Sequence, residues 1–312
     1  MVDEVTYMPG NAISPTDVSN ADILIVRTRT RCDARLLEGS AVKLIVTATI
    51  GYDHIDTDYC ASHGIEWTNC PGCNARSVCC YVVNSLRLLH RLQPGLTIGI
   101  VGVGHVGTLV AEAAISHGLK PLLCDPPRSD AGSLFNGLPF VSLSDIAVLS
   151  DIITFHTPLT LHGPYPTHHM ADTAFFDSLR KSPVIINASR GAVVDNAALL
   201  SALNTHQVSD AVVDTWEGEP YNLNRQLLHR AAISTPHIAG YSSDGKANAT
   251  RMSLMAVARW TASDYQPNIS LPDAPLLSPV TLLADSDLLK QSPDTFEQQR
   301  EHYPTRREPV TI

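Results

Sequence analysis

The chain has 312 residues, of which 44% are hydrophobic, enough apolar material for two ordinary domain cores. Its 22 Lys and Arg residues against 31 Asp and Glu residues give a net charge of −9, which argues against a nucleic acid or an anionic membrane as a partner. No stretch approaches the length needed to cross a bilayer, and the acidic start MVDEVTYMPG is unlike a secretion signal, so we expect a cytoplasmic protein.

Short apolar runs alternate with helix-sized segments along most of the chain. The expected strands lie in ADILIVRT, VKLIVTAT, TIGIVGVG, KPLLCDPP, DIITFHTP, PVIINASR, DAVVDTWE and AAISTPHI. Such runs, separated by crossover helices, predict parallel sheets. We therefore expect an α/β protein with two Rossmann-like, doubly wound parallel-sheet domains and a short C-terminal tail.

Two helical patterns predict where the chain passes between these domains. SVCCYVVNSLRLLHRL has apolar residues at helical spacing and ends at the stop signal QPG, and ANATRMSLMAVARW has a similar pattern. We expect a discontinuous substrate-binding domain over residues 1–76 and 258–272, around an NAD-binding domain over residues 77–257. Residues 273–312, rich first in proline and then in charge, are expected to be a tail without a core of its own.

Seven cysteines are scattered through the chain, an odd number that is unlike a disulfide scaffold. Cys70 and Cys73 have the spacing of zinc ligands, but a second such pair is missing, and the adjacent Cys79 and Cys80 are awkward tetrahedral ligands. We therefore expect reduced thiols and no metal site.

The segment GVGHVG follows one expected strand and begins a helical pattern, which is the context of a dinucleotide-binding turn. Gly102 permits the tight turn, Gly104 lets the backbone approach a pyrophosphate, and Gly107 allows close helix packing. Asp125 ends the next strand, where a carboxylate can accept hydrogen bonds from a ribose diol and repel the extra phosphate of NADP. The pattern predicts NAD as the cofactor, although Arg128 nearby leaves NADP open.

An enzyme that oxidises an alcohol with a nicotinamide needs a base beside the reacting carbon, and His237 in STPHIAGY is placed after a strand-like run. Arg190 follows another strand, where its planar guanidinium can hold a carboxylate in two hydrogen bonds. Asp214 and Glu219 follow a third, and a carboxylate on the far nitrogen of His237 would fix its tautomer and stabilise its protonated form. Taken singly, each residue also has a structural interpretation, as a turn cap, a solvated acid or a core histidine.

NASRGAVVDN, DTWEGEP and STPHIAGY follow GVGHVG in this order, and with TATIGYDHID, PGCNA, CDPPR, FHTPL and HIAGYSSDGKA they resemble the D-2-hydroxyacid dehydrogenase family. Within it the chain is most similar to members that oxidise a phosphorylated sugar acid in pyridoxal phosphate biosynthesis. The resemblance implies a catalytic trio of Arg190, Glu219 and His237. The cofactor contacts implied or predicted are Gly102, Gly104, His105, Val106, Gly107, Asp125, Thr157, Ala188, Ser189, Asp214 and Gly240. The substrate contacts implied are Thr28, Thr49 and Tyr241.

A phosphorylated substrate needs local positive charge on an acidic chain, and VRTRTRC offers Arg27, Arg29 and Arg31 at alternating positions. If the segment continues a strand, the period of two directs these side chains to one side. We expect Arg27 to contribute to anion capture, while Arg29 and Arg31 fit a solvated strand edge equally well.

Two departures from the family pattern concern the ends of the chain. A strand and helix that precede the segment matching EVTYMPG in the family are not matched here, and we expect an exposed strand edge and a weakened first domain. Residues 273–312 resemble an abbreviated remnant of the family's dimerisation module. The resemblance implies a homodimer, with Arg306 and Arg307 as parts of a surface that reaches the neighbouring subunit.

The expected activity is NAD-dependent oxidation of a phosphorylated 2-hydroxy acid at its C2 hydroxyl. One alternative is another D-2-hydroxyacid dehydrogenase, acting on phosphoglycerate or hydroxypyruvate. A second alternative is a catalytically silent NAD-binding interaction protein, which would bind the cofactor without turning over any 2-hydroxy acid.

Overall fold

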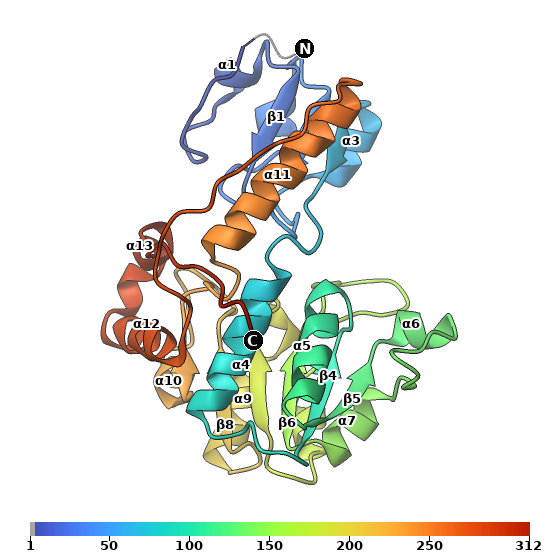
Figure 1. The fold of residues 1–312 in the computed structure, drawn as a ribbon, viewed down its shortest axis with the longest axis vertical. Helices are drawn as coiled ribbons and strands as arrows, with labels where there is room; N and C mark the ends of the chain where they lie inside the picture. Colours follow the sequence, from blue (N-terminus) through green and yellow to red (C-terminus); the bar gives the residue numbers. More distant parts are fainter. Residues whose placement is uncertain (1–3) are drawn as a thin grey trace. The chain divides into compact units, whose positions relative to one another are not determined.

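The computed structural model describes residues 4–312 and divides the chain into two compact units, each built on its own parallel sheet (Figure 1). The smaller unit contains the described residues up to Asn74 together with Ser243–Asp273, and the larger contains Ala75–Ser242 and Ala274–Ile312. The expected boundaries after residues 76, 257 and 272 therefore differ from those of the structure. The largest difference arises because helix α11 (Ser243–Trp260) lies wholly in the smaller unit.

The larger unit has a six-stranded sheet in the order β5-β4-β6-β7-β8-β9, with all pairs parallel. Its strands are β4 (Thr97–Val101), β5 (Lys120–Cys124), β6 (Ile152–Phe155), β7 (Val184–Asn187), β8 (Asp210–Val213) and β9 (Ile233–Ser234). All six were expected from their apolar runs. From β4 the chain adds β5 on one side and then crosses to add β6 on the other, so the strand order reverses beside β4. Ligands of such sheets bind at this switch point.

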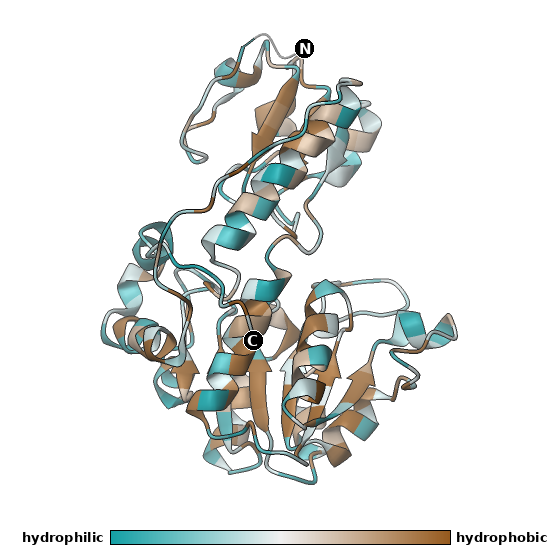
Figure 2. Cartoon of the chain, viewed as in Figure 1, coloured by the Kyte–Doolittle hydropathy of each residue, from teal (hydrophilic) through white to brown (hydrophobic). Residues whose placement is uncertain are grey.

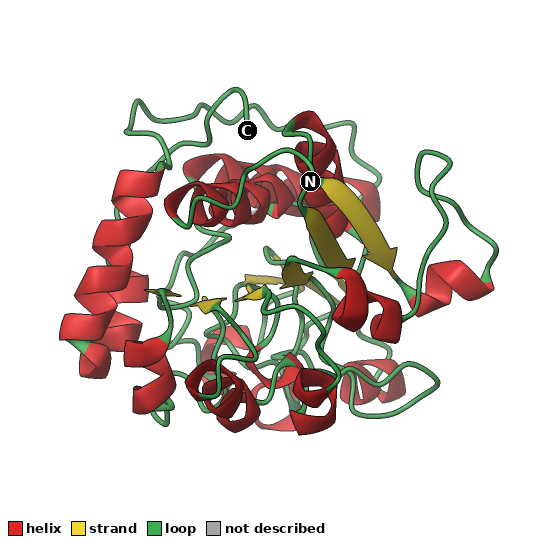
Figure 3. Ribbon diagram, turned by 90° about the horizontal axis from the view of Figure 1, so that it is seen from below, coloured by secondary structure: helices red, strands yellow, loops and turns green. Residues whose placement is uncertain are grey.

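Helices lie on either side of this sheet, which is seen nearly end-on in Figure 3. They are α4 (Ala75–Leu88), α5 (His105–Ser116), α6 (Pro126–Asp130), α7 (Leu143–Leu149), α8 (Thr173–Asp177), α9 (Asn196–Asn204), α10 (Arg225–Arg230), α12 (Pro279–Gln291) and α13 (Phe296–Glu301). Successive strand residues point to opposite faces, so Ile152 and Ile153 belong to two different core clusters. Both faces are covered, which explains why the strands are continuous apolar runs (Figure 2).

The smaller unit has a three-stranded parallel sheet in the order β1-β2-β3. The strands are β1 (Ile23–Val26), β2 (Leu44–Thr47) and β3 (Glu66–Thr68), and the helices are α1 (Pro15–Val18), α2 (Ala34–Leu37), α3 (Thr57–Ser62) and α11. Ile45 faces the cluster that contains α2, while Val46 packs with Val257 of α11. The short β3 was not expected, because its sequence EWT carries no apolar run. β1 and β3 are the edge strands of this sheet, and the weakening of this unit stays a prediction.

The C-terminal segment, residues 274–312, is folded rather than a simple tail. Its Leu282, Leu289 and Phe296 are buried in the core clusters of the larger unit. The segment has no separate core, as expected, but the expectation of a simple tail was wrong. The sequence pattern hid these helices because α12, PVTLLADSDLLKQ, buries only part of its apolar surface. None of the helices within residues 4–312 is long and apolar enough to span a membrane.

Candidate active site

The predicted cofactor and catalytic residues of the larger unit follow the carboxyl ends of its strands. Parallel strands present these ends at one edge of the sheet, and loops there are free to carry ligands. The glycine turn follows β4, Asp125 follows β5, Thr157 follows β6, Arg190 follows β7, and Glu219 and His237 follow β8 and β9.

The glycine turn has the shape that a dinucleotide requires. Gly102 has φ +86°, and a Cβ on it would lie 2.8 Å from the backbone of His156. A Cβ on Gly107 would lie 2.0 Å from the carbonyl oxygen of Gly102, so the helix can approach the strand only at glycine. A Cβ on Gly104 would meet no atom within 4 Å. The turn is closed toward the protein and open at Gly104, at the N-terminus of α5, where a pyrophosphate fits.

Asp125 is held in place for a ribose contact. One carboxylate oxygen accepts a 2.8 Å hydrogen bond from the backbone N–H of Val103, which ties Asp125 to the glycine turn. Arg128 donates a 2.6 Å hydrogen bond to the carbonyl of Val103 and lies 5.0 Å from the ring centroid of Phe140. Its guanidinium is therefore engaged by the protein, and the arrangement fits NAD better than a cofactor with an additional phosphate.

The loop after β6 lies against the glycine turn, and the loop after β7 is held by hydrogen bonds of its own. Thr157 places its methyl carbon 2.9 Å from the position of a Cβ on Gly102. In the loop after β7, the Asn187 carboxamide accepts from the Ser189 hydroxyl at 2.9 Å and donates to the carbonyl of Arg190 at 3.0 Å. This clamp fixes the backbone of Ala188 to Arg190, and Asn187 was not singled out from the sequence.

Arg190 extends from a loop that is in contact with the loop after β8. Its guanidinium donates to the carbonyl of Ser189 at 2.8 Å, and the side chain is half-buried. A Cβ on Gly191 would lie 2.1 Å from the carbonyl oxygen of Trp216, so only glycine permits this approach. The structure thereby brings the loop of Arg190 against the loop that carries Glu219.

His237 and Glu219, hereafter the His–Glu pair, are hydrogen-bonded through the imidazole Nδ1 and the carboxylate Oε1. The other carboxylate oxygen accepts from the backbone N–H of Trp216 at 2.9 Å. Burial opposes ionisation of Glu219, but the charge and hydrogen bond of His237, the Trp216 N–H and Arg300 together lower its pKa. An ionised Glu219 binds the protonated Nδ1, which leaves Nε2 as the nitrogen that can accept a proton.

Asp214 anchors the loop that presents His237. Its buried carboxylate accepts hydrogen bonds from the backbone N–H of Ile238 at 2.8 Å, the N–H of Ala239 at 2.9 Å and the Thr235 hydroxyl at 2.6 Å. Its backbone carbonyl accepts from the N–H of His237 at 2.8 Å. Burial raises the pKa of Asp214. The structure thus gives Asp214 a positioning task, and its predicted contact with the cofactor stays a prediction, as does that of Gly240.

A second histidine at a strand end, His156 after β6, is unsuited to proton transfer. Burial lowers its pKa to about 3, so its ring stays neutral. Its Nε2 is hydrogen-bonded to the hydroxyl of Thr154 at 2.9 Å. The backbone of His156 packs against Gly102 of the glycine turn, and His237 is the better candidate for the base.

The predicted substrate residues Arg27, Thr28 and Thr49 belong to the smaller unit, after the carboxyl ends of β1 and β2. The Thr49 hydroxyl is bonded to the Thr47 hydroxyl at 2.6 Å and to the carbonyl of Gly51 at 2.7 Å. The expectation that the segment after Val26 continues a strand was wrong. It is a turn, closed by a 3.1 Å bond from the Thr30 N–H to the carbonyl of Arg27.

Arg29 and Arg31 are therefore not directed to one side by the two-residue period of a strand. Arg31 forms a salt bridge of 3.0 Å with Asp33, while the side chains of Arg27 and Arg29 are exposed. The strand ends early because it pairs only with β2, through four residues.

All seven cysteines are free and buried. Burial raises the pKa of Cys73 to about 11 and of Cys79 and Cys80 to about 12, so these thiols stay protonated. Within residues 4–312 no group of three or more His, Cys, Asp or Glu side chains is arranged to hold a metal ion.

Comparison with known proteins agrees with this geometry. Residues 82–239 match the family model for the NAD binding domain of D-isomer specific 2-hydroxyacid dehydrogenases. The chain belongs to the D-isomer specific 2-hydroxyacid dehydrogenase family. It is accordingly an NAD-dependent dehydrogenase, and the expected α/β fold with parallel sheets and the expected NAD cofactor are confirmed.

Two relatives and one solved structure define its place in the family. The dehydrogenase is 49% identical to the erythronate-4-phosphate dehydrogenase of Bacteroides thetaiotaomicron, over 99% of this chain and 92% of the relative. It is 42% identical to that of Porphyromonas gingivalis, over 98% and 89%. D-lactate dehydrogenase from Aquifex aeolicus, solved with NAD and lactic acid, has a TM-score of 0.66 and 26% identity over 80% of this chain and 86% of that one.

Proposed function

We propose that this dehydrogenase oxidises 4-phospho-D-erythronate at its C2 hydroxyl to 2-oxo-3-hydroxy-4-phosphobutanoate, a step of pyridoxal 5′-phosphate biosynthesis. The observation that carries the proposal is the His–Glu pair at the carboxyl edge of an NAD-binding sheet. Identity of 42% and 49% to erythronate-4-phosphate dehydrogenases over nearly the whole chain supports the choice of substrate.

In the proposed mechanism His237 removes the C2 hydroxyl proton through Nε2, and Glu219 stabilises the imidazolium that forms. Arg190 holds the substrate carboxylate and orients C2. The glycine turn, Asp125 and the loop of Ala188 to Arg190 would hold NAD, which would supply the acceptor for the hydride of C2. The reaction thus depends on orientation and electrostatics, without a covalent intermediate.

The substrate's phosphate is assigned to Arg27, with Thr28, Thr49 and Tyr241 as further substrate contacts. Arg27 and Thr28 are exposed in a turn after β1, and Thr49 follows the neighbouring β2. Arg27→Ala tests this assignment, because loss of a phosphate contact raises the Michaelis constant for 4-phosphoerythronate. An unchanged Michaelis constant would remove Arg27 from the site.

Two further proposals concern the state of the enzyme in the cell. Seven free, buried cysteines fit the reducing cytoplasm. A homodimer fits the exposed apolar side chains of Val280 and Leu283, one turn apart on α12, with exposed fractions of 78% and 45%. Arg306 was expected to contribute to such a surface, but its side chain is only 10% exposed and is paired with Asp285 in the same chain. Light scattering of wild type and Val280→Asp tests the dimer.

The activity is tested with purified protein, NAD and 4-phosphoerythronate, by following the absorbance of the reduced nicotinamide. Catalytic efficiency should be higher than with phosphoglycerate, and higher than for reduction of hydroxypyruvate in the reverse direction. Binding of NAD without turnover of any 2-hydroxy acid would instead favour a silent NAD-binding protein. His237→Ala is the matched control, with turnover lower by on the order of 10²- to 10⁴-fold and NAD binding preserved.

A further inference from the structure

The C-terminal helix α12 supports the strand that leads to His237. β9 lies at the end of the six-stranded sheet, so its outer edge has no strand partner within the sheet. The N–H of Ser234 instead donates to the hydroxyl of Ser286 at 3.0 Å. Lys290 donates to the carbonyls of Ala231 at 2.6 Å and Ala232 at 3.1 Å. α12 thereby covers this edge of the sheet with side-chain hydrogen bonds.

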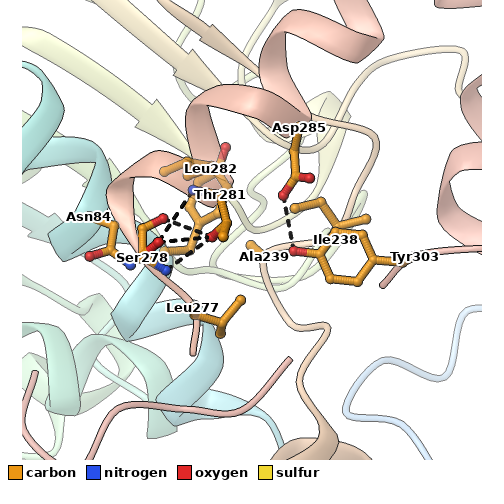
Figure 4. Close-up of a pocket in the computed structure, with 10 residues that line it drawn as sticks. Asn84, Ile238, Ala239, Leu277, Ser278, Thr281, Leu282, Asp285 and Tyr303 are labelled. Carbon is orange, nitrogen blue, oxygen red and sulfur yellow. Dashed lines mark hydrogen bonds between the residues drawn. The ribbon is translucent and has the colours of Figure 1, made fainter. Parts of the chain in front are cut away.

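A largely buried ion pair then ties α12 to the end of the chain. Asp285 accepts from the Arg306 guanidinium in a two-bond arrangement, at 2.5 and 3.0 Å, and from the Tyr303 hydroxyl at 3.1 Å. Figure 4 shows Asp285 directed at Tyr303, beside Ile238 and Ala239 of the loop after His237. These four residues contribute to the lining of a small pocket between α4, α12 and that loop. The Asp285–Arg306 ion pair fixes where the ring of Tyr303 lies.

Tyr303 and Arg300 meet Tyr241, the residue predicted to contact substrate. The rings of Tyr241 and Tyr303 are 5.8 Å apart in an edge-to-face arrangement of 84°. The Arg300 guanidinium carbon, from α13, is 6.0 Å from the Tyr241 ring centroid. The Arg300 side chain is only 15% exposed, and its salt bridge of 3.2 Å is with Glu297 on the same helix.

The positive charge of Arg300 also contributes to the lowered pKa of Glu219. The groups that act on Glu219 are thus His237 from the loop after β9, the Trp216 N–H from the loop after β8, and Arg300 from the C-terminal segment. A charge with so little exposure is weakly screened, so its effect on a neighbouring carboxylate is larger than that of a surface arginine.

We propose that Arg300 is a positioning residue of the active site, which seats Tyr241 and supplies a fixed positive charge beside the His–Glu pair. The C-terminal segment therefore completes the site within one chain. This inference rests on the proposed dehydrogenase reaction, but not on which 2-hydroxy acid is the substrate.

The test compares Arg300→Met with Arg225→Met over a range of pH, using the 2-hydroxy acid that wild type oxidises best. Arg225 pairs with Asp294 of the same C-terminal segment in an exposed salt bridge, so its variant removes the same charge and weakens the docking of that segment. Arg225 is not a residue of the proposed mechanism. Removing Arg300 takes away a positive charge that helps to lower the pKa of Glu219, so protonation of the His–Glu pair should begin at higher pH. We expect kcat/KM to fall about tenfold near neutral pH, and its acid limb to move upward by about half a pH unit or more.

Arg300→Lys separates charge from shape, since lysine retains the charge but not the planar guanidinium. The acid limb should return to the wild-type position in this variant. Unfolding curves confirm that each variant is folded, and Arg300→Gln replaces Arg300→Met if the latter is not.

Three results would overturn the inference. One is a pH profile of Arg300→Met that matches the profile of Arg225→Met. Another is a loss of activity with an unmoved acid limb, which would indicate a merely structural role. The last is an acid limb that stays displaced in Arg300→Lys. Failure of wild type to oxidise any 2-hydroxy acid is a separate outcome, which would contradict the proposed function itself.

Discussion

Two glycines of the same turn offer a test that separates cofactor binding from folding. Gly104→Ala adds a methyl group that meets no protein atom within 4 Å, whereas Gly107→Ala adds one that would lie 2.0 Å from the carbonyl oxygen of Gly102. The chemical change is identical, and the two sites are three residues apart. Any difference between the variants therefore comes from what surrounds each Cβ.

The expected magnitudes follow from these surroundings. Gly107 lies in the first turn of α5, where alanine gains about 1 kcal/mol of helix propensity. Backbone overlap at 2.0 Å outweighs this gain, and we expect a net loss of at least about 2 kcal/mol of unfolding free energy. Gly104 is the N-cap of α5, and alanine there costs no more than about 1 kcal/mol. Its methyl group occupies the space proposed for the pyrophosphate, so the dissociation constant of NAD should rise at least about tenfold, or 1.4 kcal/mol.

Urea unfolding without cofactor measures the first quantity, and fluorescence titration with NAD measures the second. Gly104→Ala should be folded and bind NAD weakly, while Gly107→Ala should be destabilised before any cofactor is added. Wild-type affinity of Gly104→Ala for NAD would refute the placement of the pyrophosphate. Equal destabilisation of both variants would refute the steric argument.

Three further changes test the support of His237. Glu219→Gln should lower turnover by on the order of 10²-fold in steady-state assays, because it removes the carboxylate that stabilises the imidazolium, and unchanged turnover would contradict the proton relay. Because the pKa of Glu219 is lowered in the folded state, its contribution to stability is complete above its unfolded pKa and is lost as pH falls through its folded pKa. The urea midpoint of wild type should therefore fall at acid pH, and the midpoint of Glu219→Gln should fall less. Asp214→Asn should cost about 2 kcal/mol of unfolding free energy, since an amide group cannot accept all the hydrogen bonds made to the carboxylate. Ser286→Ala should cost about 1 to 2 kcal/mol by leaving the buried N–H of Ser234 unpaired, and a cost near zero would mean that α12 does not stabilise β9.

The larger unit was predictable because its signals are local. Each strand is an apolar run buried on both faces, and each predicted site residue follows a strand by a few positions. The spacing of Gly102, Gly104 and Gly107 encodes backbone constraints that the structure reproduces as steric limits. The pairing of Glu219 with His237 was predicted for the same reason, since neighbouring parallel strands bring their following loops together.

The C-terminal segment was not predictable in this way because its contacts are long-range. Arg300 stands in a polar stretch, QQRE, and nothing in its immediate sequence indicates that its guanidinium is buried beside Tyr241. Lys290 and Ser286 have the composition of an exposed helix face, yet they bond the edge of a strand more than fifty residues earlier. The turn at Arg27 was missed because a three-stranded sheet ends sooner than the β-branched and polar residues after Val26 suggested.

The position of His237 directly after an edge strand explains why the larger unit needs this segment. An interior strand is fixed by hydrogen bonds on both sides, but β9 pairs with β8 through only two residues. A base must be held to a fraction of an ångström to be effective, and an edge strand of this length frays readily. The Asp214 carboxylate holds the loop from the inner side, and α12 holds the strand from the outer side. Removing either support alone should therefore raise the activation free energy of turnover by more than it lowers the free energy of unfolding, because the loop can shift without unfolding the sheet.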